Sequence, residues 1–249
     1  SNPDLKPETS TSKTLGLVWS PSFVTGLNVT LVWWKVEIKN ATTRPAVAVN
    51  LNNCYNGTPQ QKAAYCGLIT RDPDYGTTAE HYAITNIDMP LLNLSSYKVE
   101  GWDLGLAYKL PETSFGQFTV TWDSTYLSKW ETKSTDDAPV DGRQGRYLNQ
   151  DPYGPIRSNL YVDWSFGDFG VNWGMRYKSG LTETCTLGAA LAAVYCSDAA
   201  GGTNHIGATT YHDLQVRYNT PWKGTVMLGL NNVFDKQPPT SYVVAYNMF

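Results

Sequence analysis

The chain has 249 residues, of which 41% are hydrophobic and 13% aromatic, and 19 basic and 22 acidic residues give it a formal net charge of −3. This composition excludes a disordered chain, and scattered charges without a basic cluster argue against a nucleic-acid partner. No apolar run approaches the ~18 residues of a spanning helix. A membrane location would therefore require a closed barrel, in which strands pair every backbone N–H and C=O group.

Two strands are expected near the amino terminus. Residues 12–19 alternate between apolar and polar side chains, the two-residue period of a strand. After a short connector at residues 20–26, residues 27–39 alternate again. In this second strand the apolar phase shifts between the adjacent Trp33 and Trp34. The shift indicates either a bulge or the point where the strand leaves a bilayer.

A long excursion follows, from Asn40 to about Ser96. Within it, residues 58–61 read Thr-Pro-Gln-Gln, which is typical of a helix start with a capping threonine, a proline at the first position and a glutamine three residues after the cap. We therefore expect a short helix between Cys54 and Cys66. Residues 80–88 are expected to form a strand that extends past the bilayer surface.

The four cysteines fall into two local pairs, Cys54 with Cys66 and Cys185 with Cys196. Two local disulfides are predicted, each contributing roughly 3 kcal/mol by loop-closure entropy, and they suit an oxidising compartment. The alternative is a metal site, but no His or Cys stands at the short spacing that zinc prefers.

Residues 117–131 carry the clearest pattern in the chain. Fifteen residues, QFTVTWDSTYLSKWE, alternate strictly, and the apolar face has aromatic rings at both ends with smaller groups between them. This layout is typical of a strand that crosses a bilayer with rings at both interfaces. Five further stretches alternate in the same way: residues 98–109, 157–166, 171–178, 209–219 and 225–230.

The connectors between these eight strands alternate between short and long. Tight turns on one side and long loops on the other are typical of an outer-membrane β-barrel, with the turns periplasmic and the loops extracellular. The third long loop, residues 182–208, contains an alanine-rich segment that could form one or two helical turns. We therefore predict an all-β, transmembrane, antiparallel up-and-down β-barrel that passes the bacterial outer membrane several times.

Eight strands are enough to close a small barrel whose interior is filled by side chains. The face opposite the apolar one, however, carries charges that a narrow, dry interior would have to pair. They are Arg157, Asp163, Arg176, Lys178, Asp213 and Arg217. A wide lumen shared with further strands would hydrate them instead.

Three segments resemble the barrels of TonB-dependent receptors. They are NPDLKPETS at residues 2–10, CYNG with AAYCGLITRDP at residues 54–73, and GLNNVFDKQPP at residues 229–239. Together they span nearly the whole chain, from residue 2 to residue 239. The resemblance implies that residues 1–249 are roughly the C-terminal third of a 22-stranded barrel. The plug domain and the energy-coupling motif would lie outside this sequence. The last strand would also lie outside it, because Asn247 breaks the alternation that a final strand should show.

The function that this resemblance implies is active import of a scarce nutrient. The implied partners are outer-membrane lipid, the nutrient itself (a siderophore, cobalamin, an oligosaccharide or a peptide), the TonB energy-coupling complex acting through the missing N-terminal region, and a surface lipoprotein. The alternatives are a passive porin, a self-contained eight-stranded surface or adhesion protein, and a soluble glycan-binding β-protein.

Ligand recognition is expected on the long loops, because aromatic rings and planar polar groups hold sugars and chelates by stacking and hydrogen bonding. The candidates are Arg143, Arg146, Tyr147, Asn149, Tyr153, Tyr195 and Tyr242; the alternative is that they only pack the loops together. No catalytic constellation is found: His81, His205 and His212 are isolated, and no serine lies in a GxSxG turn. RDPDYG at residues 71–76 lacks the further ligands of a calcium loop. We expect neither an enzyme nor a cofactor or metal.

Overall fold

The computed structural model describes residues 2–72, 83–148, 151–185, 193–194 and 196–241. The chain divides into two compact units. The first unit is Ser1–Ser12, Val36–Val99 and Glu131–Gly142, and the second is Lys13–Lys35, Glu100–Trp130 and Arg143–Phe249. The alanine-rich segment of the third loop lies largely outside the described residues, as does the start of the strand expected at residues 80–88.

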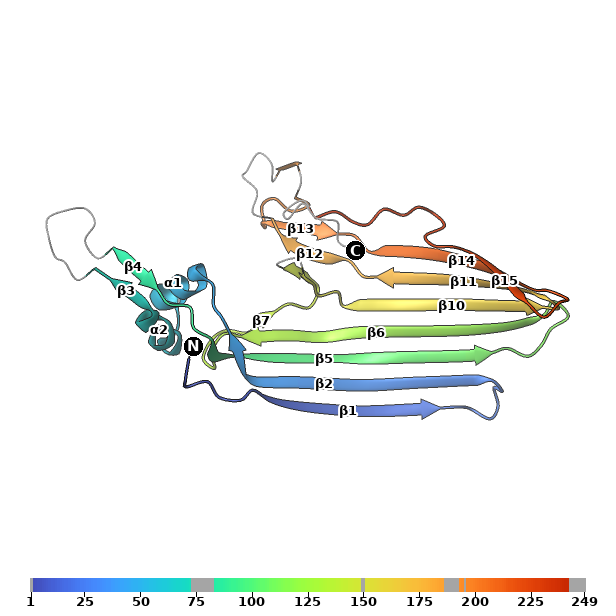
Figure 1. Ribbon diagram of the computed structural model, residues 1–249, viewed down its shortest axis with the longest axis horizontal. Coiled ribbons are helices and arrows are strands. Elements are labelled where there is room, and N and C mark those ends of the chain that lie inside the picture. Colours follow the sequence, from blue (N-terminus) through green and yellow to red (C-terminus); the bar gives the residue numbers. More distant parts are fainter. Residues whose placement is uncertain (1, 73–82, 149–150, 186–192, 195, 242–249) are drawn as a thin grey trace. The chain divides into compact units, whose positions relative to one another are not determined.

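The main sheet contains the eight strands that alternation predicts. Their order is β1-β2-β5-β6-β10-β11-β14-β15, side by side in Figure 1. Their bounds are β1 Thr9–Trp19, β2 Leu27–Thr43, β5 Leu92–Lys109, β6 Gln117–Lys133, β10 Ile156–Phe166, β11 Phe169–Lys178, β14 Thr209–Asn219 and β15 Thr225–Leu230. The registers of β6 with β10, β10 with β11, β11 with β14 and β14 with β15 are antiparallel and unbroken. The strand prediction is confirmed, and β1 and β15 form the two edges of a sheet that does not close.

The connectors keep the predicted alternation of short and long. The short ones are residues 20–26, 110–116, 167–168 and 220–224. Between β10 and β11 the turn is tighter than the expected residues 167–170, because Gly167 adopts φ +55°, a conformation that glycine enters without strain. The two strands therefore pair as far as Phe166 and Phe169.

The apolar series of this sheet is not covered by a second layer. Trp122 is 37% exposed and Leu228 is 75% exposed. Among the described residues, the only cluster of buried apolar side chains lies in the loops, at Tyr147, Leu181 and Ile206. A soluble sandwich would bury these strand faces against each other, so the structure contradicts that alternative and fits a sheet whose apolar face meets lipid.

The first unit contains the predicted short helix, α2 at Pro59–Tyr65. The Thr58 side chain accepts a hydrogen bond from the Gln61 backbone amide, and the Gln61 side chain accepts one from the Thr58 amide. This capping box confirms the expected helix start. The Cys54–Cys66 disulfide is formed. No helix in the described part of the chain is long and apolar enough to cross a membrane.

A second helix, α1 at Val47–Asn56, precedes α2 and was not predicted. Its N-cap, Ala46, offers no side chain to cap the first turn, so the usual signal is absent. The helix is anchored instead by Asn50, whose side-chain amide donates to the Asp88 carbonyl. After the 3₁₀ turn η1 (Cys66–Leu68), β3 (Ile69–Arg71) pairs with β4 (Ile84–Ile87), which is the described end of the strand expected at residues 80–88.

The second unit contains a small loop sheet that was also not predicted. Its order is β13-β12-β8-β9, with β13 at Thr203–Ile206, β12 at Leu181–Thr184, β8 at Arg146–Leu148 and β9 at Asp151–Pro152. The second disulfide, Cys185–Cys196, is formed beside it. In the first unit β7 (Asp141–Gly142) pairs with β6. Strands of two to four residues are too short to show a period, which is why alternation did not find them.

Candidate functional site

Two arginine–aspartate pairs join the polar side chains of β10, β11 and β14. Arg176 of β11 donates from Nε and Nη2 to both carboxylate oxygens of Asp213 on β14, at 2.8 and 3.0 Å. Arg217 of β14 donates to both oxygens of Asp163 on β10, at 2.9 and 3.1 Å. Their side chains are between 24% and 44% exposed. Four of the six predicted interior charges are therefore paired in bidentate geometry on a face that remains open to water.

Glycines make room for these side chains to lie flat on the strands. A Cβ added at Gly170 would stand 2.5 Å from Nε of Arg217, and one at Gly174 would stand 3.1 Å from the Tyr161 ring. Gly174 and Tyr161 are direct partners in the β10–β11 register. The polar face therefore carries long side chains laid along it, as in a water-lined lumen.

An aromatic and cationic cluster forms where β6 ends and the second long loop begins. The Arg143 guanidinium donates from Nη1 to the Tyr153 hydroxyl at 3.2 Å and lies 5.7 Å from that ring's centroid. The Trp130 ring packs against the Tyr153 ring, and their centroids are 4.9 Å apart. The indole N–H of Trp130 is buried without a hydrogen-bond partner among the described residues. Two of the predicted loop residues are thus brought together, with Trp130 as a member that the sequence did not indicate.

Arg146 and Tyr147 lie in β8, one strand from this cluster. The Arg146 backbone donates to the Arg143 carbonyl, and Tyr153 donates back to the Arg146 carbonyl, both at 2.9 Å. Tyr147 is only 5% exposed and packs with Leu181 and Ile206. Burial, with the charges of Glu183 and Asp151, raises the pKa of the Tyr147 phenol. Tyr147 therefore supports the loop sheet from beneath, whereas Arg143, Arg146 and Tyr153 lie nearer the surface.

The three remaining candidates, Asn149, Tyr195 and Tyr242, lie outside the described residues. His212, expected as an interfacial histidine, stacks on Trp173 with ring centroids 5.5 Å apart and meets the edge of Phe234 at 5.1 Å. Among the described residues, no group of His, Cys, Asp and Glu has the geometry of a metal site.

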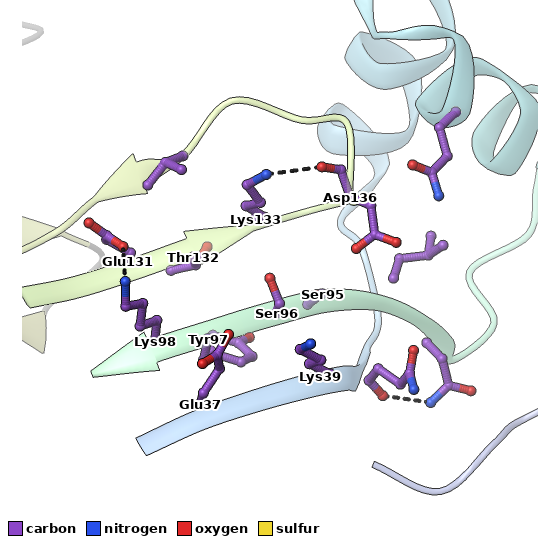
Figure 2. Close-up of a pocket in the computed structure, with 15 residues that line it drawn as sticks. Glu37, Lys39, Ser95, Ser96, Tyr97, Lys98, Glu131, Thr132, Lys133 and Asp136 are labelled. Carbon is purple, nitrogen blue, oxygen red and sulfur yellow. Dashed lines mark hydrogen bonds and ion pairs between the residues drawn. The ribbon is translucent and has the colours of Figure 1, made fainter. Parts of the chain in front are cut away.

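The first unit holds a polar pocket of about 490 Å³, which Figure 2 shows in close-up. Its walls come from β2, β5 and β6, with contributions from α2 and from the loop after β6. The lining is mainly charged, hydroxyl and amide side chains: Glu37, Lys39, Asn40, Gln60, Asn93, Leu94, Ser95, Ser96, Tyr97, Lys98, Glu131, Thr132, Lys133, Asp136 and Val140. Donors and acceptors of both charges therefore surround one cavity.

Two of the internal contacts of this charge are drawn in the close-up. Lys98 Nζ lies 3.8 Å from Glu131 Oε2, and Lys133 donates to the Asp136 carbonyl at 2.9 Å, as the dashed lines in Figure 2 show. This pocket was not predicted from the sequence. The signal was present in the second strand, where the series ending at Trp33 continues as Lys35 and Glu37.

The fold and the polar face together define a class: a segment of a transmembrane barrel whose lipid-facing side chains are exposed and whose opposite face is hydrated. A family model described as "TonB dependent receptor-like, beta-barrel" matches residues 1–233. The chain belongs to this family, whose members are bacterial outer-membrane receptors and transporters, a class that is not enzymatic. No curated protein sequence matches the chain.

Solved structures show the same fold. The ferripyoverdine receptor of Pseudomonas aeruginosa is 15% identical, with a TM-score of 0.53 over 93% of this chain and 24% of that one. The siderophore receptor PirA of Acinetobacter baumannii is 18% identical, with a TM-score of 0.58 over 96% and 29%. The outer membrane transporter YddB of Escherichia coli is 11% identical, with a TM-score of 0.57 over 96% and 30%. The chain therefore spans 24–30% of the length of these structures.

Proposed function

We propose that this chain is the C-terminal part of a 22-stranded outer-membrane transporter that takes up an iron chelate by active transport. The observation that carries the proposal is the family match over residues 1–233, combined with an open sheet whose polar face is water-lined. An eight-stranded closed barrel is disfavoured, because β1 and β15 remain unpaired with each other at the edges of the sheet. Further strands that pair with β1 and β15 would account for the open edges of the sheet and for its water-lined polar face.

The nutrient class is inferred from the structural relatives. Their names refer to ferripyoverdine, to ferric enterobactin and to siderophores. A ferric chelate of this kind is a large, polar and often anionic ligand, for which a guanidinium beside aromatic rings is a suitable partner. Cobalamin, an oligosaccharide or a peptide are the other nutrients that such a loop surface could hold.

The contact surface proposed for this nutrient is the Arg143–Tyr153–Trp130 cluster. Arg146, Asn149, Tyr195 and Tyr242 would extend it, and Tyr147 would hold it in place from below. The Arg143 guanidinium, which carries five N–H groups, donates one of them to the Tyr153 hydroxyl. The buried indole N–H of Trp130 is a further donor beside the same ring.

Energy for import would come from the TonB complex, acting on a plug domain. A surface lipoprotein is a further proposed partner. Import coupled in this way differs from passive diffusion in one measurable respect, because it stops when the proton-motive force is removed.

The test uses the whole receptor in cells, with ferripyoverdine, ferric enterobactin and cobalamin as labelled probes. Arg143→Ala and Tyr153→Ala should each weaken binding of the transported probe about tenfold, the effect expected when a charge-assisted contact is lost. The matched control is Arg71→Ala, because Arg71 lies over the Tyr55 ring at 5.6 Å in the first unit, in a similar arrangement. Uptake that persists without a proton-motive force would show a passive porin and overturn the proposal.

A further inference from the structure

The polar pocket lies entirely within the first unit. Every residue of its lining belongs to Val36–Val99 or to Glu131–Gly142, whereas Arg143, Tyr153 and Trp130 belong to the second unit. Its volume of about 490 Å³ is in the range of small-molecule sites. The pocket therefore shares no residue with the cluster proposed for the nutrient, and its ligand has to be inferred from its own lining.

The walls of this pocket are joined to one another by hydrogen bonds. The backbone amide of Gln60 in α2 donates to the Asp137 carboxylate at 3.1 Å, and the Asp137 amide donates back to Gln60 Oε1 at 3.3 Å. The Asn93 side chain of β5 donates to the Asn40 carbonyl of β2 at 2.8 Å. These bonds fix α2 to the loop after β6, and β5 to β2, without the help of a ligand. The pocket is therefore preformed, which lowers the entropic cost of binding.

Two charged side chains of the lining stand outside these internal contacts. Among the described residues, neither the Lys39 ammonium group nor the Asp136 carboxylate takes part in an ion pair. Both residues are exposed. Figure 2 shows Lys39 on β2 and Asp136 on the loop after β6, with Ser95 and Ser96 of β5 between them. The pocket therefore offers a ligand one cation and one anion, with hydroxyl groups between the two.

These two charges distinguish between classes of ligand. A simple anion would pair with Lys39 but would be repelled by the Asp136 carboxylate, and a neutral sugar would use neither charge. A zwitterion pairs with both at once, each time through a charge-assisted hydrogen bond. A short peptide with free ends is an elongated zwitterion, and its backbone N–H and C=O groups suit the serine hydroxyl groups between the two charges.

We propose that this pocket binds a short zwitterionic peptide, with the α-carboxylate of the peptide at Lys39 and its α-ammonium group at Asp136. The ion pair between Lys98 and Glu131, with 3.8 Å between Nζ and Oε2, contributes no net charge to the same lining. The peptide is a ligand in addition to the iron chelate, because the two sites have no residue in common. This assignment therefore does not depend on the proposed transport function.

The test measures binding of trialanine to the whole receptor in detergent, by isothermal titration calorimetry. Loss of one charge-assisted contact reduces affinity about tenfold. Lys39→Gln and Asp136→Asn should therefore each weaken trialanine binding about tenfold. The matched controls are Lys62→Gln and Asp4→Asn, which make the same changes at exposed residues of the first unit outside the lining. Both controls should leave the affinity unchanged.

Blocking the ends of the peptide assigns each end to its partner. N-acetyl-trialanine lacks the ammonium charge and should bind the unaltered receptor about tenfold more weakly than trialanine. In Asp136→Asn the acetyl group should make no further difference, because the contact is already lost. Trialanine amide, which lacks the carboxylate charge, should behave in the same way with Lys39→Gln.

Four results would overturn the proposal. They are no binding of trialanine, equal affinity for the free and the blocked peptides, equal affinity for inorganic phosphate, and losses in the two controls as large as those in Lys39→Gln and Asp136→Asn. Hydrogen exchange of the α2 amides should be the same in every variant as in the unaltered receptor, which separates loss of the ligand from loss of the fold.

Discussion

Two regions of the second unit differ in whether their apolar side chains are exposed or buried. In β15 the apolar series is exposed, with Leu228 as the clearest example, and in β14 Val216 is exposed while Leu214 is half-buried. In the loop sheet, Tyr147, Leu181 and Ile206 are buried against one another. The difference shows which solvent each region meets. Loops in water need a core to offset their conformational entropy, whereas strands in lipid need only complete backbone pairing and an apolar outer surface.

Polar groups follow the same division. The Arg176–Asp213 pair on the strands is partly open to water and joins two side chains of the polar face. Glu183 in the loop sheet is only 2% exposed, and its carboxylate accepts hydrogen bonds from Asn204 at 2.7 Å and from Ser241 at 2.5 Å. A buried carboxylate must be satisfied by fixed partners. The loop sheet therefore depends on specific contacts in a way that the hydrated face does not.

Tyr147→Ala should produce the largest effect, because it empties the centre of the loop core. Removing a buried aromatic ring costs about 3–5 kcal/mol, and the loss should fall on the loop sheet alone. Hydrogen exchange on the whole receptor should show β8, β12 and β13 unprotected, while β10, β11 and β14 keep their protection. Tyr147→Phe, which keeps the ring, is the control. Equal loss of protection in both regions would show that they are not separately stabilised.

Leu214→Arg should produce the next largest effect, this time on the strands. Leu214 stands at the middle of β14 and pairs with Trp173 and Leu230 in the apolar series. An arginine facing lipid at mid-bilayer costs about 2–4 kcal/mol. Unfolding of the receptor from lipid vesicles by denaturant should show this loss. The control is Gln215→Arg, one residue along on the polar face, which should cost little; a similar cost for both would reverse the assignment of the two faces.

The same division explains what could be predicted from the sequence. The long strands were predictable because alternation is a local pattern. In a run such as residues 117–131, consecutive side chains show directly which face is apolar and which is polar. The capping box at Thr58 was predictable for the same reason. The loop sheet was not, because β8 pairs in parallel with β12, more than thirty residues further on, through contacts that leave no short-range pattern.

The candidate site was predictable only in part. Arg143 and Tyr153 were recognised by residue type, and the structure adds that they touch each other and Trp130. Trp130 was assigned to the apolar face of its strand, because alternation cannot show that β6 extends beyond the bilayer and meets a loop there. The polar pocket of the first unit was missed because Lys39, Lys98 and Glu131 come from three strands that only the sheet order brings together.

Thr58→Ala should produce a smaller effect, in the disulfide-pinned helices of the first unit. It removes the acceptor of the Gln61 amide, and loss of such a cap costs about 1 kcal/mol. Hydrogen exchange of the α2 amides should quicken, while the strands of the second unit remain unchanged. Thr58→Ser keeps the hydroxyl and should restore protection; if it does not, the cap is not what holds the helix start.

The smallest effect should be a pH dependence of the same helix start, through Asp137. Its carboxylate accepts hydrogen bonds from the Gln60 amide at 3.1 Å and from the Thr135 hydroxyl at 2.8 Å. Burial raises the pKa of this carboxyl, but these bonds and one from Thr58 outweigh it, so the pKa lies below its ordinary value. A lowered pKa contributes stability that is complete above the unfolded value of about 3.9 and is lost as pH falls through the folded value. Protection of α2 should therefore decline in acid, and Asp137→Asn should flatten that decline. Asp136→Asn is the matched control, and a decline that survives Asp137→Asn unchanged would assign the pH dependence to another group.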